Sequence, residues 1–116
     1  MRILILEDDL SRMVHFKKAL LKHIVDHTED SKAAIELLKE HNYDTLFLDH
    51  DLGGKQLVAS GEGTGYEVAE WLSKNDSRKP RQIYLHSLNG PGRKNMKSVL
   101  PEAVEAPFAW LHIMDA

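Results

Sequence analysis

The sequence predicts an α/β fold in which one open parallel sheet carries helices on both of its faces. Short apolar runs alternate with segments whose apolar residues recur at helical spacing. This alternation is typical of parallel strands that are joined by right-handed helical crossovers. A length of 116 residues suits one compact unit, so we expect a single domain over residues 1–116.

Five segments are expected to form the strands of this sheet. Ile3–Leu6 and Thr45–Leu48 are continuous apolar runs bounded by polar residues, which favours strands that are buried on both faces. Ile24–Thr28 and Gln82–Leu85 have the length and the placing of two further strands, and Ala103–Ala106 is a weaker fifth one. The predicted sheet is therefore five-stranded.

Helices are expected between these strands. The four helical segments are Leu10–Lys22, Asp30–Glu40, Gly65–Lys74 and the short Arg93–Leu100. Asp8 or Asp9 is placed to cap the first of them. The irregular segments are the turn Asn89–Gly92, the tail Pro107–Ala116 and the glycine-rich Leu52–Thr64, which fits either a flexible lid or a plain loop.

Composition excludes several classes of function. The absence of cysteine rules out a disulfide scaffold, a thiolate zinc site and a cysteine nucleophile. Fifteen basic against eighteen acidic residues give a net charge of −3, so we expect no duplex DNA binding. No apolar run approaches the ~20 residues of a membrane span, and the N-terminus does not read as a signal peptide. We therefore expect a cytoplasmic protein without a membrane partner.

Polar clusters follow three of the predicted strands. They are Glu7-Asp8-Asp9, Asp49-His50-Asp51 and His86-Ser87 with Asn89. Ligands of open α/β sheets bind beyond the carboxyl ends of the strands, where these clusters would meet. Grouped carboxylates favour a hard divalent cation, magnesium or manganese. Each of these residues can instead have a purely structural role. An acid after a strand, for example, often only caps the next helix.

The pattern ILILEDD, LFLDHDL, TGYEV and IYLHS resembles a response-regulator receiver domain, a flavodoxin-like fold. The resemblance implies that Glu7 and Asp8 bind magnesium, that Asp49 accepts a phosphoryl group, and that Asp51 offers its backbone carbonyl to the metal. Two features depart from that family. Ala106 stands where receivers carry a lysine, and the last receiver helix is missing or is replaced by the tail. Both departures argue against ordinary phosphorelay signalling.

A narrower likeness covers nearly the whole chain. DHDLGG, TGYEVAEWL, HSLNGPGRKNM and PFAW are similar to cyclic-phosphate processing receiver domains. That family implies processing of cyclic phosphates in bacterial or phage RNA repair or nucleotide metabolism. A small phosphorylated ligand or an RNA end is then the expected partner.

The residues themselves allow such chemistry. His50 and His86 can act as base and acid near neutral pH, and their rings could flank one phosphate. A metal on Glu7, Asp8, Asp49 and Asp51 could polarise the phosphoryl oxygen, or Asp49 could act as a nucleophile. Ser87 and Asn89, with Arg93 and Lys94 at the start of the fourth helix, are the expected phosphate ligands; that end of a helix favours anions.

We therefore predict a metal-dependent phosphoesterase that acts on a cyclic or terminal phosphate, with Asp49, His50 and His86 as catalytic residues. Two alternatives stay open: a signalling receiver phosphorylated on Asp49, and a protein that binds a nucleotide without turnover. Without a last helix, one face of the sheet is thinly covered, which predicts a homodimer.

Overall fold

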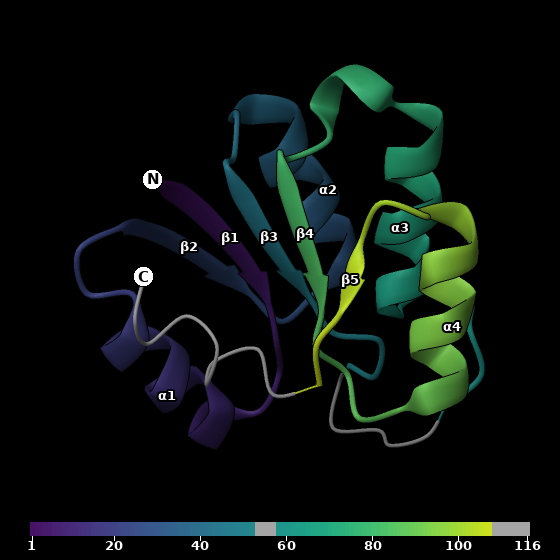
Figure 1. Cartoon of the computed structure of the whole chain (residues 1–116), viewed down its shortest axis with the longest axis horizontal. Helices are drawn as coiled ribbons and strands as arrows, with labels where there is room; N and C mark the ends of the chain where they lie inside the picture. The colour runs from purple at the N-terminus through teal and green to yellow at the C-terminus, as the bar shows by residue number, and fades with distance from the viewer. Residues whose placement is uncertain (53–57, 108–116) are drawn as a thin grey trace.

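The computed structural model describes residues 1–52 and 58–107 and contains one five-stranded parallel sheet (Figure 1). The strands are β1 (Arg2–Leu6), β2 (Ile24–Thr28), β3 (Thr45–Leu48), β4 (Gln82–Leu85) and β5 (Val104–Glu105). Their order across the sheet is β2-β1-β3-β4-β5, and every neighbouring pair is parallel. This is a doubly wound order, in which the carboxyl ends of β1 and β3 form the crevice where ligands bind.

The helices cover the two faces of the sheet unequally. They are α1 (Leu10–Ala19), α2 (Ser31–Glu40), α3 (Gly65–Lys74) and α4 (Gly90–Val99), with a short 3₁₀ turn, η1 (Asp76–Arg78). Among the described residues, α1 alone covers one face, while α2, α3 and α4 lie together on the other (Figure 1). The predicted fold class is confirmed.

Side-chain alternation along the strands builds a separate core on each face. Ile5 and Phe47 point to α1 and pack with its Phe16. Leu6 and Leu48, one residue further along, belong to the larger core under α2, α3 and α4. Both strands are buried throughout this stretch, as their continuous apolar sequence predicts.

Side-chain caps define where the helices begin. Asp9, not Asp8, caps α1, because its carboxylate accepts the backbone N–H groups of Ser11 and Arg12. Asp30 and Thr64 cap α2 and α3 in the same manner. Each cap satisfies a backbone donor that the helix leaves unpaired, which contributes about 1 kcal/mol.

Two predicted helix boundaries are wrong by three residues, and the start of α2 and the end of α4 differ by one. The first helix ends at Ala19 rather than at Lys22, since a turn after Leu20 leads the chain into β2. The fourth begins at Gly90 rather than at Arg93: Asn89 caps it and a proline occupies its first turn. The segment predicted as a turn is therefore the first turn of α4, because proline fits there without losing a hydrogen bond.

Parts of the prediction fall outside the described residues. These are the middle of the glycine-rich loop, 53–57, and the tail, 108–116, on which the expectation of a missing last helix depends. In the part of the chain that the structure describes, no helix combines the length and apolarity needed to cross a membrane.

Candidate functional site

Strand register brings Glu7, Asp49 and His86 to one level of the sheet. Leu6 pairs with Leu48, and Leu48 pairs with Leu85. The residue after each of these leucines therefore stands at the same height, just beyond the carboxyl ends of three adjacent strands. All three side chains are buried, with exposures of 0%, 1% and 0%.

Glu7 is the central hydrogen-bond acceptor of this group. Its Oε1 accepts hydrogen bonds from Arg12 Nε at 2.7 Å and from His86 Nε2 at 2.9 Å. Its Oε2 accepts Arg12 Nη2 and the backbone N–H groups of Asp8 and Asp9, each at 3.0 Å. Burial alone would raise the pKa of Glu7, but the hydrogen bonds from His86 and Arg12 lower it well below its usual value. Glu7 is therefore ionised at neutral pH.

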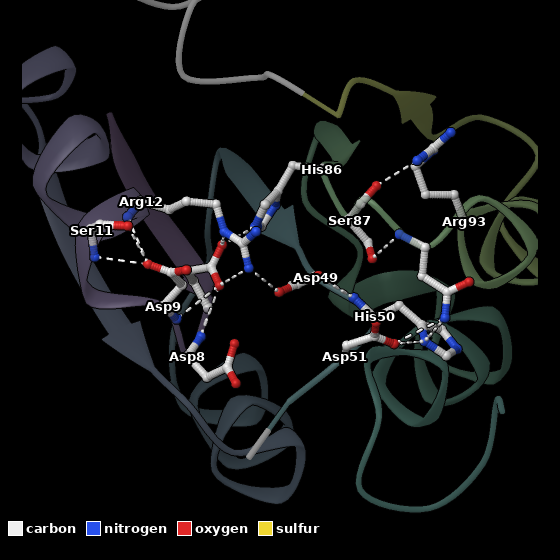
Figure 2. Close-up of polar contacts among 12 residues, drawn as sticks. Asp8, Asp9, Ser11, Arg12, Asp49, His50, Asp51, His86, Ser87 and Arg93 are labelled. Atoms are coloured by element: carbon white, nitrogen blue, oxygen red, sulfur yellow. Dashed lines mark hydrogen bonds and ion pairs between the residues drawn. The ribbon is translucent and has the colours of Figure 1, made fainter. Parts of the chain in front are cut away.

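Arg12 bridges the two buried carboxyl groups from α1. Its Nη2 lies 3.3 Å from Asp49 Oδ2 while Nε and Nη2 together hold Glu7 (Figure 2). Its side chain is 22% exposed, and Nη1 donates no hydrogen bond to the described residues. The bidentate pair with Glu7 fixes the guanidinium at the edge of the site and leaves one nitrogen free for a ligand.

Asp49 has the most perturbed acidity in the site. Burial, followed by repulsion from Glu7, raises its pKa to about 8, although Arg12 and the Ser87 hydroxyl oppose this. Its Oδ1 accepts the backbone N–H of His50 at 2.8 Å. At neutral pH the carboxyl is protonated, so the cluster of Glu7, Arg12 and Asp49 carries almost no net charge.

His86 completes the cluster under α1. It is fully buried against the edge of the Phe16 ring, with centroids 5.2 Å apart. Burial lowers its pKa, against the opposing effect of Glu7. The neutral ring donates Nε2–H to Glu7, and Nδ1 has no partner among the described residues although it is buried. Such an unpaired acceptor is rare inside proteins and marks a position where a ligand can bind.

His50 belongs to a different group on the opposite face. Because side chains alternate, His50 follows Leu48 toward α3 and α4, whereas Asp49 and His86 point to α1. A Cβ on Gly92 would lie 2.5 Å from His50 Cγ, so α4 packs directly on the imidazole. The structure therefore separates the two histidine rings that we expected to flank one phosphate, and Asp49 lies between them (Figure 2).

Both nitrogens of His50 have partners. Nδ1 lies 2.8 Å from Asp51 Oδ1, and Nε2 lies 2.8 Å from Ser60 Oγ. Asn89 Nδ2 donates to Asp51 Oδ1 at 3.0 Å, while its Oδ1 caps α4 through Gly92 N–H. Asp51 and Asn89 thus serve the His50 group and do not face the Glu7 cluster.

The remaining predicted phosphate ligands are placed less directly. Arg93 Nη1 donates to the Ser87 carbonyl at 2.6 Å and Nε lies 3.4 Å from Glu105, so its guanidinium is engaged inside the protein. Lys94 is exposed on the second turn of α4. Ser87 is buried beside Asp49 and accepts the N–H of Asn89. Phosphate binding by these residues stays a prediction.

A divalent cation fits the donor set. One ligand atom from each of Glu7, Asp49 and His86 lies within 4.8 Å of the others, and this grouping could hold a metal ion. Two carboxylates and an imidazole are donors that magnesium and, more readily, manganese accept. His86 Nδ1, the ring nitrogen that does not contact Glu7, has no hydrogen-bond partner among the described residues. Asp8 and Asp51 contribute no ligand atom to this grouping.

Sequence reasoning missed Arg12 and Ser60. Arg12 lies one helical turn into α1, and no motif distinguishes it from the other basic residues of that helix. Ser60 stands in the irregular loop before α3. One available signal was not used: with period-two alternation, Asp49 and His50 must point to opposite faces.

A cavity of about 320 Å³ lies beside that loop, apart from the cluster. Its lining is Glu29, Asp30, Leu52, Val58, Ala59, Glu62, Gly63 and Thr64. Glu29, Asp30 and Glu62 contribute carboxylates to this lining, and Lys32 Nζ lies 2.8 Å from Glu62 Oε1. None of the lining residues belongs to the Glu7 cluster.

The fold and the strand-end acids define a receiver-like domain. Among solved structures, the response regulator TrrA from Thermotoga maritima in complex with Mg²⁺-BeF is 22% identical with a TM-score of 0.71, covering 98% of this chain and 93% of that one. The chemotaxis protein CheY4 from Vibrio cholerae is 15% identical with a TM-score of 0.71, covering 98% and 92%. No curated protein sequence is significantly similar.

The chain belongs to the cyclic-phosphate processing receiver domain family, whose model matches residues 3–102. This agrees with the resemblance found in the sequence. Ala106, which directly follows β5, stands where ordinary receivers have a lysine. Arg12 from α1 supplies instead a cation beside Asp49.

Proposed function

We propose that the protein is a phosphoesterase that acts on a cyclic or terminal phosphate of a nucleotide or an RNA end. The observation that carries this proposal is Arg12: its guanidinium is fixed by Glu7 and reaches Asp49, its side chain is 22% exposed, and its Nη1 donates to none of the described residues. An arginine held in this manner can bind a phosphate oxygen without further rearrangement.

The charge of the cluster supports an anionic substrate. With Glu7 ionised, Arg12 positive and Asp49 protonated, a phosphate meets no net negative charge. In the absence of a metal ion, the protonated Asp49 carboxyl can donate a hydrogen bond to a phosphate oxygen. His86 Nδ1, which has no partner, can accept a proton or a hydrogen bond from substrate or water.

A magnesium or manganese ion would be held by Glu7, Asp49 and His86 and would polarise the phosphoryl oxygen. When no cation is present, Arg12 balances the negative charge of Glu7. The guanidinium must release part of its contact with Glu7 to admit a metal, because all lone-pair positions of Glu7 are taken.

One observation favours a second candidate, phosphorylation on Asp49. This residue ends the central strand β3 and lies beside a cation, as a phosphoacceptor would. The alanine at 106 argues against it, because a receiver uses the lysine there to sense the phosphoryl group. Acetyl phosphate distinguishes the candidates: a phosphoacceptor gains the mass of one phosphoryl group on Asp49.

The deciding experiment is phosphorus NMR of the protein with nucleoside 2′,3′-cyclic phosphates, with magnesium, with manganese and with chelator. We expect the cyclic signal to convert to a monoester, and Asp49→Asn to abolish the conversion. Arg81→Gln, a change at an exposed arginine away from the site, is the matched control. Binding without conversion would favour nucleotide sequestration. If the protein neither binds nor converts the cyclic phosphates, the proposal is refuted.

A further inference from the structure

Asp51, His50 and Ser60 form a continuous hydrogen-bonded line. Asp51 Oδ1 lies 2.8 Å from His50 Nδ1, and Ser60 Oγ lies 2.8 Å from His50 Nε2. We propose that Ser60 is a nucleophile that His50 activates and Asp51 orients, and that it attacks the phosphorus of the substrate. This inference rests on the proposed phosphoesterase function and places its covalent step beside His50, on the other side of Asp49 from Arg12 (Figure 2).

The hydrogen bonds allow one assignment of the protons. In the tautomer that carries its proton on Nδ1, His50 donates to Asp51 Oδ1 and Nε2 presents its lone pair. Asn95 Nδ2 donates to Ser60 Oγ at 2.9 Å, which leaves the hydroxyl proton of Ser60 to point at Nε2. This is the arrangement in which an imidazole removes a proton from a serine.

The line is held rigidly at its buried end and is open at the other. His50 is fully buried, with α4 packed on its ring through Gly92. Asn89 secures Asp51 at 3.0 Å. Ser60 is only half-buried and its donor Asn95 is exposed, so the Ser60 end of the line is the end that a substrate can approach.

No other serine hydroxyl among residues 1–52 and 58–107 is hydrogen-bonded to an imidazole. Ser11 donates to the cap residue Asp9, Ser31 donates to Glu67, and Ser73 and Ser98 donate to carbonyls of their own helices. The contacts of Ser11, Ser73 and Ser98 are ordinary local bonds, and that of Ser31 joins α2 to α3. Ser60 differs from them because the partner of its hydroxyl is an imidazole nitrogen.

The reaction balances without any further reagent. Ser60 Oγ bonds to phosphorus while the bond from phosphorus to the ribose 2′ or 3′ oxygen breaks. The Oγ proton passes to His50 Nε2 and from there to the departing ribose oxygen. Water then attacks the phosphoserine diester with His50 as base, Oγ leaves and regains a proton, and the net change is one water added to the cyclic ester.

Labelling with diisopropyl fluorophosphate tests the serine directly. We expect intact mass and peptide mapping to locate one adduct on Ser60, absent in Ser60→Ala. Asp51→Asn should slow labelling by about 10³-fold or more, as loss of the orienting acid does in serine hydrolases. Ser77→Ala, an exposed serine in η1, is the matched control and should label like the parent.

Turnover of adenosine 2′,3′-cyclic phosphate separates the two proposals. Conversion by the parent that is lost in Ser60→Ala supports the covalent step. Conversion that is equal in parent and Ser60→Ala overturns it and leaves the phosphoesterase intact. Specific labelling of Ser60 in a parent that converts nothing supports an activated serine and refutes the proposed substrate. Circular dichroism confirms that each variant is folded.

Discussion

Asp49 is held in its uncommon protonation state by the residues around it. Burial and the neighbouring charge of Glu7 raise its pKa to about 8, and its protonated carboxyl shares a hydrogen bond with Glu7. The folded protein therefore keeps a proton that the unfolded chain releases near pH 4. For that reason, the contribution of Asp49 to the free energy of unfolding falls as the pH rises from about 4 to 8. Above pH 8 this contribution stays constant.

Asp49→Asn should stabilise the protein, and by more at pH 9 than at pH 5. The amide can donate to Glu7 as the protonated carboxyl does, but it has no proton to lose. We expect the difference in the free energy of unfolding to widen by more than about 1 kcal/mol between these pH values. Urea titrations of parent and variant at both pH values measure it. A constant difference would mean that Asp49 is ionised in the folded protein.

Arg12 should control phosphate affinity through its geometry as well as its charge. We expect Arg12→Lys to weaken binding of a nucleoside cyclic phosphate about 10-fold and Arg12→Gln about 100-fold, since a hydrogen bond to a charged group contributes about 1.5–3 kcal/mol. Isothermal titration calorimetry measures both, with Lys22→Gln, at an exposed lysine beyond the end of α1, as a charge-matched comparison. Equal losses for Lys22→Gln and Arg12→Gln would indicate general attraction rather than a specific contact.

At the scale of elements, the close packing of α3 and α4 on the end of β3 depends on two glycines. A Cβ on Gly65 would lie 1.7 Å from the Asp49 carbonyl oxygen, and Gly65 N–H donates to the His50 carbonyl at 2.9 Å. Gly92 gives α4 the same close approach to the His50 ring. These contacts explain why α3 and α4 can begin directly against the site.

Gly92→Ala should therefore destabilise the protein while Gly90→Ala, in the same helical turn, should not. The added methyl group at 92 overlaps the His50 ring, for which overpacking costs about 1–3 kcal/mol. At 90 the only neighbour is the end of Arg93 at 3.9 Å, and alanine favours helix over glycine by about 1 kcal/mol. Thermal unfolding compares them, and similar melting temperatures would contradict the close packing.

At the scale of the whole molecule, several of the exposed apolar side chains among the described residues lie on α1 or next to it. Leu10, Val14, Leu21 and Ile24 are all at least half exposed on α1 or between it and the start of β2. Among the described residues, α1 is alone on this face of the sheet. Contiguous exposed apolar residues commonly mark a contact between proteins.

We expect a homodimer formed through this surface. Replacing Leu10 and Val14 together by glutamine should give a monomer, whereas Leu88→Gln, at an exposed apolar residue after β4, should leave the dimer intact. Light scattering at several concentrations measures the mass. A monomeric parent at the highest concentration would refute the prediction.

The fold was predictable because its signals are local. Alternating apolar runs and helical stripes identified every strand and the class of sheet, and β2, β3, β4 and α3 match their predicted bounds. The polar residues after three strands had to meet, since parallel strands end at one edge. Glu7, Asp49 and His86 could therefore be grouped from sequence, and the site they form is now placed on the α1 face.

The partners of those residues depend on tertiary structure. Whether Arg12 reaches Asp49 depends on how α1 packs across the sheet, and whether Ser60 reaches His50 depends on how an irregular loop folds against α4. Neither contact lies at a spacing that sequence alone can read, since the paired residues are 37 and 10 positions apart. The sequence by itself determined which residues stand at the sheet edge. Packing decided which of them share a face, which carry a cation and which lie beside a serine, because side-chain direction and helix docking are set only when the cores form.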